Sequence, residues 1–310
     1  MKRVLTNDFS WSKSRHEKLA ECERAYFFQY YRSWGGWEQR APEEVKTLFG
    51  LKKLHSRFTW AGSAVHGAVR DALRSYRAQR PVDAAALIER VHQDMLAQFR
   101  HSKARRYRAD RRTFEGLVEH EYDEPVAPAE WKRNWDTVKG ALEWFFASRW
   151  PALAQAIPAE RWLEVDENDF DHSSFLLDGV KVFAVPDFAW LEEDGTPRVV
   201  DWKTGGAREG YDDQVIGYAM YVAERYRLDV MRVRTSLVFL NAGTEQEVAI
   251  SPEALARFRE HFEESTGRMR ALLADPAANV ARDADAFPLT TDLTRCARCV
   301  FRRPCGRTGG

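Results

Sequence analysis

The stretch VPDFAWLEEDGTPRVVDWKTGG, residues 185–206, decides the fold class because two short β-prone runs flank a turn. Its acids stand near strand ends: Asp187 follows a proline, and Asp201 stands two residues before Lys203. Residues two apart on a strand share a face, so Asp201 and Lys203 point to the same side. The runs VKVFAVPD and RVVDWK each lead up to an acid. This predicts that Asp187 and Asp201 lie close together on neighbouring strands.

Two clustered carboxylates repel each other and are costly unless a positive charge lies between them. A hard divalent cation supplies that charge, and Mg²⁺ prefers oxygen ligands. Lys203 would then stabilise a developing anion or help to activate water. The alternative is purely structural: Asp187 and Asp194 are turn residues, and Asp201 pairs with Lys203.

The flanking sequence predicts both helices and strands. Residues from about 161 to 205 form short β-prone runs separated by Asp-Gly turn signals, which indicates a meander of strands. A helix is expected at about 212–226, then a strand at 233–243, then a helix with Ser251 as N-cap and Pro252 at its first position. The upstream half is predicted to be mainly helical, since apolar residues recur there at helical spacing. The helical sets are Leu19, Cys22, Tyr26 and Tyr30; Leu87, Val91, Met95 and Phe99 behind the cap Asp83; and Trp131, Trp135, Val138, Leu142 and Phe146. The expected fold class is α/β (α+β), with a helical N-terminal half laid onto a mixed sheet.

Bulk composition limits the location and the partners. The chain has 310 residues and 44% hydrophobic content, which allows one elaborated domain or two modest ones. No apolar run reaches the roughly 18 residues that span a bilayer, and the start MKRVLTNDFSWSKSRHEK lacks a signal-like apolar segment. A cytoplasmic protein with no membrane partner is therefore expected. Lys plus Arg equals Asp plus Glu at 47 each, so a nucleic-acid surface would have to be local.

One such local surface is the run RHSKARRYRADRR at 100–112, which has seven Lys or Arg against one acid. It is either a solvated helix end or a patch that contacts phosphates.

The spaced acids and lysine resemble a known catalytic signature. "PD", thirteen residues and "DWK" are similar to the motif of the PD-(D/E)XK nuclease superfamily, and DWKTG followed by QVIGY resembles its RecB-like subgroup. GSAVH is similar to the Gly-x-x-x-His element of that subgroup, matched by Gly62 and His66. The resemblance runs from about residue 60 to 240. It implies a restriction-endonuclease-like mixed sheet flanked by helices.

The resemblance also implies roles for single residues. Asp187, Asp201 and Lys203 would be catalytic. Mg²⁺ or Mn²⁺ would be bound by His66, Asp187, Asp201 and the main-chain carbonyl of Trp202, while Gln214 and Tyr218 would bind the DNA strand. Each added residue has a bland alternative: His66 as a structural histidine, and Gln214 with Tyr218 as one face of an amphipathic helix.

The four cysteines predict a second metal centre. They are Cys22, Cys296, Cys299 and Cys305, and disulfides are disfavoured in a cytoplasmic chain. Ligand chemistry leaves zinc and iron–sulfur open. One N-terminal cysteine with a C-terminal trio resembles AddB-like and CRISPR-adaptation-type nucleases, which implies a [4Fe-4S] cluster that pins the two termini together. The basic residues around the trio, Arg295, Arg298, Arg302 and Arg303, would face DNA or be solvated.

The predicted function is a metal-dependent deoxyribonuclease, an exonuclease that prefers single-stranded DNA or DNA ends, in DNA repair or recombination, CRISPR adaptation or phage defence. The aromatic residues Trp34, Trp37, Tyr107 and Trp131 would stack bases, or else pack in the core. No Walker-type loop is present, so a helicase would be a separate partner. The expected regions are 1–160, helical; 161–275, nuclease core; and 276–310, cluster segment. The alternatives are a non-catalytic DNA-binding scaffold and a zinc-stabilised interaction protein.

Overall fold

The structure is a computed structural model that describes residues 5–110, 113–165, 174–206 and 210–307. Within these ranges the α-helices are α1 (Lys13–Glu21), α2 (Glu23–Phe27), α3 (Glu43–Leu51), α4 (Arg57–Arg77), α5 (Ala84–Lys103), α6 (Val118–Glu121), α7 (Pro128–Ala147), α8 (Trp150–Ala156), α9 (Tyr211–Tyr226), α10 (Pro252–Ala271) and α11 (Leu293–Ala297). The strands are β1 (Ser10–Trp11), β2 (Leu54–His55), β3 (Gly116–Leu117), β4 (Trp162–Glu164), β5 (Ser174–Leu177), β6 (Val180–Phe183), β7 (Phe188–Leu191), β8 (Pro197–Lys203), β9 (Arg234–Phe239), β10 (Thr244–Val248), β11 (Leu273–Asp275) and β12 (Val280–Ala281).

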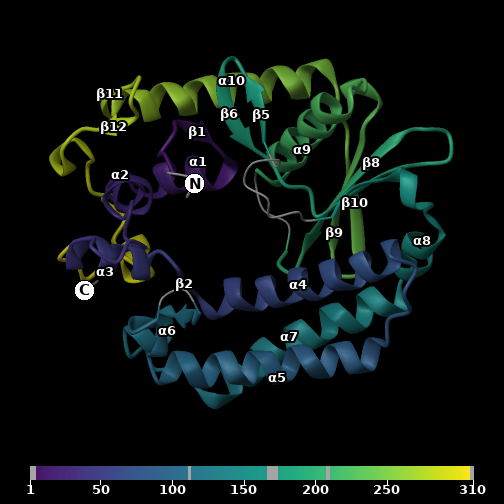
Figure 1. Ribbon diagram of the computed structural model, residues 1–310, viewed down its shortest axis with the longest axis horizontal. Helices are drawn as coiled ribbons and strands as arrows, with labels where there is room; N and C mark the ends of the chain where they lie inside the picture. The colour runs from purple at the N-terminus through teal and green to yellow at the C-terminus, as the bar shows by residue number, and fades with distance from the viewer. Residues whose placement is uncertain (1–4, 111–112, 166–173, 207–209, 308–310) are drawn as a thin grey trace.

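The central sheet has the order β10-β9-β8-β7-β4, with β8 and β9 parallel and the other pairs antiparallel. Helix α9 packs on one face of this sheet, and the layer of α4, α7 and α8 lies on the opposite side (Figure 1). The predicted α/β class, a mixed sheet flanked by helices with a largely helical N-terminal half, is confirmed.

The alternation of side chains along β8 explains why both faces are covered. Val199 belongs to the same core as α9, whereas Val200 and Trp202 belong to the core formed with α4, α7 and α8. The Trp202 ring meets Trp150 edge-on, with the ring centroids 4.9 Å apart. A strand that is buried on both sides requires a largely apolar run; the polar residues of β8 are Arg198, which pairs with Glu245 and Glu247, and the site residues Asp201 and Lys203.

The expected meander of strands is wrong in one respect. The run VKVFAVPDFAWL is two strands in two different sheets: β6 pairs with β5 and β1, while β7 pairs with β8 and β4. Residues 184–187 join them, and Pro186 in this link has no N–H to donate to a ladder. Asp187 therefore stands before the first residue of β7 rather than at the end of an apolar strand.

The helix signals are confirmed where a cap is present. Asp83 accepts the N–H of Ala86 at 3.0 Å at the start of α5, and Ser251 accepts the N–H of Ala254 at 3.1 Å at the start of α10. The run from Leu19 to Tyr30 is not one helix, however. Cys22 is extended, with φ −169° and ψ 117°, and separates α1 from α2.

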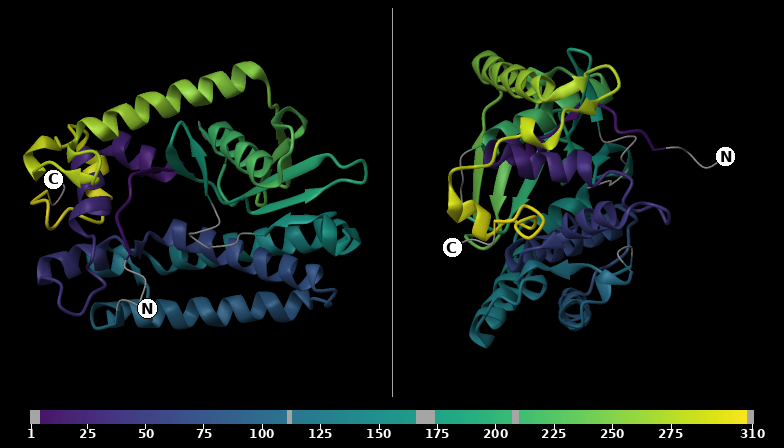
Figure 2. Two further views of the ribbon diagram at one scale, coloured as in Figure 1. Left: turned by 45° about the horizontal axis from the view of Figure 1, so that its top comes forward. Right: turned by 90° about the vertical axis from the view of Figure 1, so that its left-hand side faces the viewer.

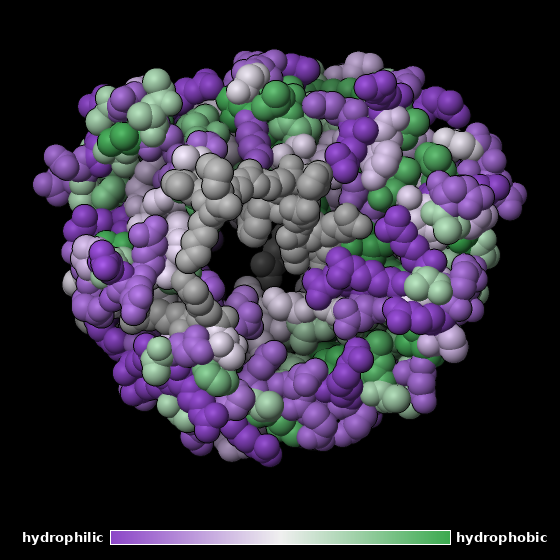
Figure 3. Space-filling model, viewed as in Figure 1, coloured by the Kyte–Doolittle hydropathy of each residue, from purple (hydrophilic) through white to green (hydrophobic). Residues whose placement is uncertain are grey.

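The C-terminal segment packs beside the N-terminal helices, as the yellow and purple ribbons show from each side (Figure 2). Arg24 Nε donates to the carbonyl of Phe287 at 3.0 Å, and Phe28 packs against Phe301 with the ring centroids 5.6 Å apart. The face seen in Figure 3 is hollowed at its centre, and the coloured side chains to the right of the hollow are largely hydrophilic. Among the helices of the described ranges, none has the length and apolar character to cross a bilayer.

Candidate active site

Strand β8 presents Asp201 and Lys203 on the same side, as the period of two predicts. Lys203 Nζ lies 2.5 Å from Asp201 Oδ2. Asp201 is buried, with 2% of its side chain exposed, and Lys203 is the partner of its Oδ2 in the described part of the chain. Two buried carboxylates this close to each other are costly without neutralising cations, and a divalent metal ion would supply that charge.

Asp187 connects the sheet to helix α4. Its Oδ2 accepts the main-chain N–H of Trp202 at 2.8 Å, and its Oδ1 lies 3.0 Å from His66 Nδ1. Gly62, one turn before His66, lies where α4 passes Thr204: a Cβ at this position would be 3.4 Å from Thr204 Oγ1, which is an ordinary van der Waals contact. The two acids that are separated in sequence are therefore held by neighbouring strands, with the histidine supplied by a helix.

The charges of this group shift the pKa values in opposite directions. Burial, and then the charge of Asp187, raise the pKa of Asp201 to about 7, although Lys203 acts to lower it. Burial would raise the pKa of Asp187 as well, but His66 and the Trp202 N–H hold it low. Burial would lower the pKa of His66, yet Asp187 and Asp201 outweigh it and raise this pKa to about 9. In the protein without metal, the side chains of His66 and Lys203 thus lie next to the carboxylates of Asp187 and Asp201.

Helix α9 places Gln214 and Tyr218 next to the lysine. Lys203 Nζ donates to Gln214 Oε1 at 2.7 Å, and Gln214 Nε2 donates to the Tyr218 hydroxyl at 2.6 Å. Both residues lie one turn apart and form a polar chain that leads to Lys203, rather than a solvent-facing stripe.

One aromatic residue at this site was missed from sequence. Tyr211 is the first residue of α9, and Lys203 Nζ lies 4.2 Å from the centroid of its ring. The available signal was spacing, since Tyr211 stands three residues before Gln214 and so occupies the same helix face. The helix was expected to start one residue too late to include it.

The donor set suits a hard divalent cation. Two carboxylates and an imidazole, the side chains of Asp187, Asp201 and His66, are ligands found in Mg²⁺ and Mn²⁺ sites. Within residues 5–110, 113–165, 174–206 and 210–307, however, no three His, Cys, Asp or Glu side chains are already arranged around one ion position. The reason is visible in the contacts: Lys203 and His66 are paired with the acids.

The four cysteines are brought together from the two ends of the chain. All four are free thiols. Burial raises the pKa of Cys299 and of Cys305; the neighbouring Cys22 acts in the same direction on both, and Cys296 does so on Cys305. Cys299 Sγ accepts the N–H of Phe301 at 3.3 Å. In the described part of the chain, these thiols also have no ready metal geometry.

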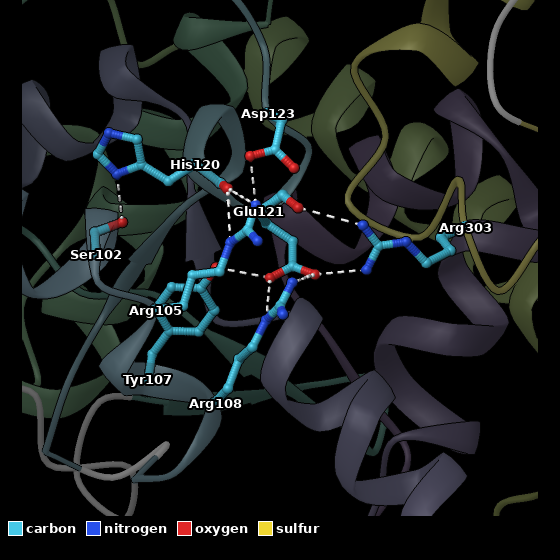
Figure 4. A network of polar contacts seen from close by, with 8 residues as sticks. All are labelled: Ser102, Arg105, Tyr107, Arg108, His120, Glu121, Asp123 and Arg303. Carbon is cyan, nitrogen blue, oxygen red and sulfur yellow. Dashed lines mark hydrogen bonds and ion pairs between the residues drawn. The ribbon is translucent and has the colours of Figure 1, made fainter.

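Two arginines of the basic run at 100–112 have partners within the protein (Figure 4). Arg105 donates to the carbonyl of His120 and to Asp123, at 2.8 and 2.6 Å. Arg108 donates to both oxygens of the buried Glu121, at 2.9 and 3.0 Å, and Arg303 donates to the same carboxylate at 2.7 Å. Arg108 nevertheless keeps 46% of its side chain exposed, and the run also exposes Arg100, Lys103 and Arg106, which fits a solvated helix end. Residues 111 and 112 of the run lie outside the described ranges.

Of the C-terminal arginines that were expected to face DNA or solvent, Arg302 is buried, whereas Arg295, Arg298 and Arg303 keep exposed side chains. Arg302 pairs with Glu124 at 2.5 Å, and Arg295 Nη1 donates to the carbonyls of Ala20 and Glu21 at 3.1 Å each. They hold the C-terminal segment against the N-terminal region.

The aromatic residues suggested for base stacking are mainly packed. Tyr107 is 5% exposed and donates to Glu121 at 2.6 Å. Trp131 packs edge-on against Phe99, and Trp34 against Trp37. The core-packing alternative is therefore correct for Tyr107, and these ring contacts support it for the three tryptophans.

A mixed sheet that holds two acids and a lysine at adjacent strands, with helices on both sides, defines a class of hydrolytic nucleases. A family model described as "PD-(D/E)XK nuclease superfamily" matches residues 10–306. The chain belongs to the PD-(D/E)XK nuclease superfamily. A search of curated proteins gives no significant match.

Proposed function

We propose that the protein is a Mg²⁺- or Mn²⁺-dependent deoxyribonuclease whose site is formed by His66, Asp187, Asp201 and Lys203. The observation that carries this proposal is the convergence of these four side chains, from α4, the start of β7 and β8, into one buried ion-pair group. The bound divalent cation would polarise the scissile phosphate and favour the attack of water.

The protein's own residues have separate tasks in this proposal. Asp187, Asp201, His66 and the carbonyl of Trp202 would hold the cation. Lys203 would stabilise the charge that develops on the phosphate oxygens, and its bond to Gln214 fixes where the ammonium points. Gln214 and Tyr218 would position the strand next to Lys203.

A preference for single strands or DNA ends remains part of the proposal. The packing of Tyr107 removes one of the aromatic side chains that suggested it. A role in repair or recombination, CRISPR adaptation or phage defence, and a helicase partner, follow from the RecB-like resemblance alone.

Digestion of labelled DNA tests the activity. Linear and circular, single- and double-stranded substrates are incubated with Mg²⁺ or Mn²⁺, and products are resolved by length. An exonuclease degrades linear single strands and spares circles, whereas cleavage of circles identifies an endonuclease. Equal cleavage by wild type and by Asp201→Ala would overturn the proposed site.

We further propose that Cys22, Cys296, Cys299 and Cys305 bind one [4Fe-4S] cluster. The support is the gathering of four free thiols from the two ends of the chain, since four cysteines are the ligand set of such a cluster. The N–H bond to Cys299 Sγ matches the hydrogen bonding that tunes cluster sulfurs.

Metal analysis of two cysteine variants tests this centre. After purification without oxygen, Cys22→Ser and Cys299→Ser should both lose iron and sulfide, since either change removes one of four ligands. Asp201→Ala is the control and should keep the cluster. Full iron in Cys22→Ser would exclude Cys22 as a ligand, and stoichiometric zinc in wild type would replace the cluster with a zinc centre.

A further inference from the structure

The ammonium of Lys203 lies over the aromatic ring of Tyr211, the first residue of α9. The distance from Lys203 Nζ to the centroid of this ring is 4.2 Å. The face of an aromatic ring carries partial negative charge, so it attracts an ammonium group that lies within about 6 Å of the centroid. The contact is made by the ring face and does not involve the tyrosine hydroxyl. It therefore restricts where the ammonium of Lys203 can point.

Two features fix the position of the Tyr211 ring. Gly210 stands directly before α9 with a φ of +79°, a left-handed conformation that favours glycine, and a Cβ there would lie 2.6 Å from Lys13 Nζ. The Tyr211 ring also packs against Phe239, with the ring centroids 6.4 Å apart. Phe239 is the register partner of Lys203 on β9, so the strand next to the lysine supports the ring that the lysine contacts.

Three contacts hold the ammonium of Lys203: Asp201 Oδ2 at 2.5 Å, Gln214 Oε1 at 2.7 Å and the Tyr211 ring. Among these partners, Asp201 is the one that would also bind the divalent cation. Its attraction for the ammonium weakens when the carboxylate also holds a cation, because like charges repel each other. The two contacts with α9 would then hold Lys203, and Gln214 would in addition position the DNA strand. The ring of Tyr211 is therefore the contact that serves the lysine alone.

We propose that Tyr211 is a positioning residue for the nuclease reaction, and that the face of its ring holds the ammonium of Lys203 in place while Asp201 binds the divalent cation. This role rests on the proposed function, because the reaction that it serves is phosphodiester hydrolysis. An ammonium with a fixed position stabilises the charge that develops on the phosphate better than a mobile one does. The alternative is that Tyr211 only fills space at the start of α9.

Steady-state cleavage of the DNA substrate that the wild type cleaves fastest tests this role at saturating Mg²⁺ or Mn²⁺. Tyr211→Phe keeps the ring and should cleave like wild type. Tyr211→Leu keeps apolar bulk without the negative ring face. It should lower kcat about tenfold and leave KM unchanged, because Lys203 acts on charge that develops in the transition state. Phe49→Leu, which removes a ring 5.0 Å from Lys53 Nζ at the end of α3, is the matched control and should keep the wild-type kcat.

Fluorine substitution separates the charge of the ring from its shape. Phenylalanine analogues with increasing numbers of fluorine atoms, incorporated at position 211, withdraw negative charge from the ring face at nearly constant size. The kcat should therefore fall stepwise as fluorine atoms are added, while circular dichroism shows unchanged helix content. If the fully fluorinated ring supports the same kcat as Tyr211→Phe, Tyr211 only fills space and the proposal is wrong.

A double-mutant cycle gives a readout that does not depend on cleavage. Urea unfolding in chelator is compared for wild type, Tyr211→Leu, Lys203→Met and the double variant. The contact predicts that Tyr211→Leu lowers the free energy of unfolding less in the Lys203→Met background than in the wild type. Additive effects overturn the positioning role even if the wild type cleaves DNA. Absence of cleavage by the wild type is a different result: it rejects the proposed function and, with it, the role of Tyr211 in the reaction, while a coupled cycle still shows the contact.

Discussion

At the scale of single residues, the surroundings of Asp201 disfavour its ionised form. Burial and the neighbouring Asp187 raise its pKa to about 7, so the ionised carboxylate costs the metal-free protein free energy. Asp201→Asn removes that charge and should lower cleavage by roughly 100-fold or more, while the Tm of the metal-free protein does not fall. Cleavage assays and thermal unfolding in chelator check both parts.

Lys203→Met is the informative counterpart of that substitution. It should also abolish cleavage, but it leaves the buried Asp201 without its ion pair and should therefore lower the Tm. Equal Tm changes for the two variants would contradict this account of the site's charges.

The proximity of the site residues on β8 and α9 could be predicted from sequence because they lie in short spaced motifs. Asp201 and Lys203 lie on β8, and Gln214 lies on α9, the next helix along the chain. These consecutive elements pack together, which brings the three residues into contact. The ion pair of Arg302 with Glu124 could not be found in this way, because it depends on how the C-terminal residues pack against the helical half, and no local spacing encodes that packing.

At the scale of elements, the approach of α4 to β8 sets the distance between His66 and the acids. Gly62→Ala adds a Cβ at 3.4 Å from Thr204 Oγ1 and should be tolerated. Gly62→Ile adds a branched side chain at the same contact, and it should displace the helix and reduce cleavage by about tenfold or more. Steady-state kinetics of the two variants, with circular dichroism to verify helix content, measure the effect.

A result in which Gly62→Ile cleaves like wild type would show that α4 has room to shift without moving His66. The element pattern itself was predictable where caps or long apolar periods exist, as at α5, α9 and α10. It failed at β6 and β7, since one continuous β-prone run does not reveal that its halves join different sheets.

At the scale of the whole molecule, Glu121 ties the C-terminal segment to the helical half. Burial acts to raise its pKa, but Arg108, Tyr107 and Arg303 hold it below its usual range. Its stabilising contribution is therefore complete above the unfolded-state pKa of about 4.3, and it is lost as the pH falls through the lower folded-state value. Glu121→Gln should cost roughly 3 kcal/mol at neutral pH and remove that acid dependence.

Limited proteolysis and denaturant unfolding at several pH values check this prediction. In Glu121→Gln, the segment around Arg303 should be cleaved faster at pH 7, whereas Asp123→Asn, an exposed acid paired with Arg105, serves as the control. Unchanged cleavage and stability in Glu121→Gln would mean that the cysteine segment is held by other contacts. The contact between Glu121 and Arg303 could not be predicted from a local sequence pattern, because the two residues are 182 positions apart.

The docking of the C-terminal segment also sets an order of events during synthesis. Phe27 packs on Phe287, and Phe28 on Phe301, so these N-terminal aromatic residues leave the ribosome long before their partners exist. Strand β1 likewise cannot pair until β6 has been synthesised. A nascent chain therefore carries the exposed run AYFFQYY, residues 25–31, through most of translation. Slow elongation near the end of the message would prolong that exposure, so we expect the yield of folded protein to rise when chaperones are supplied during synthesis.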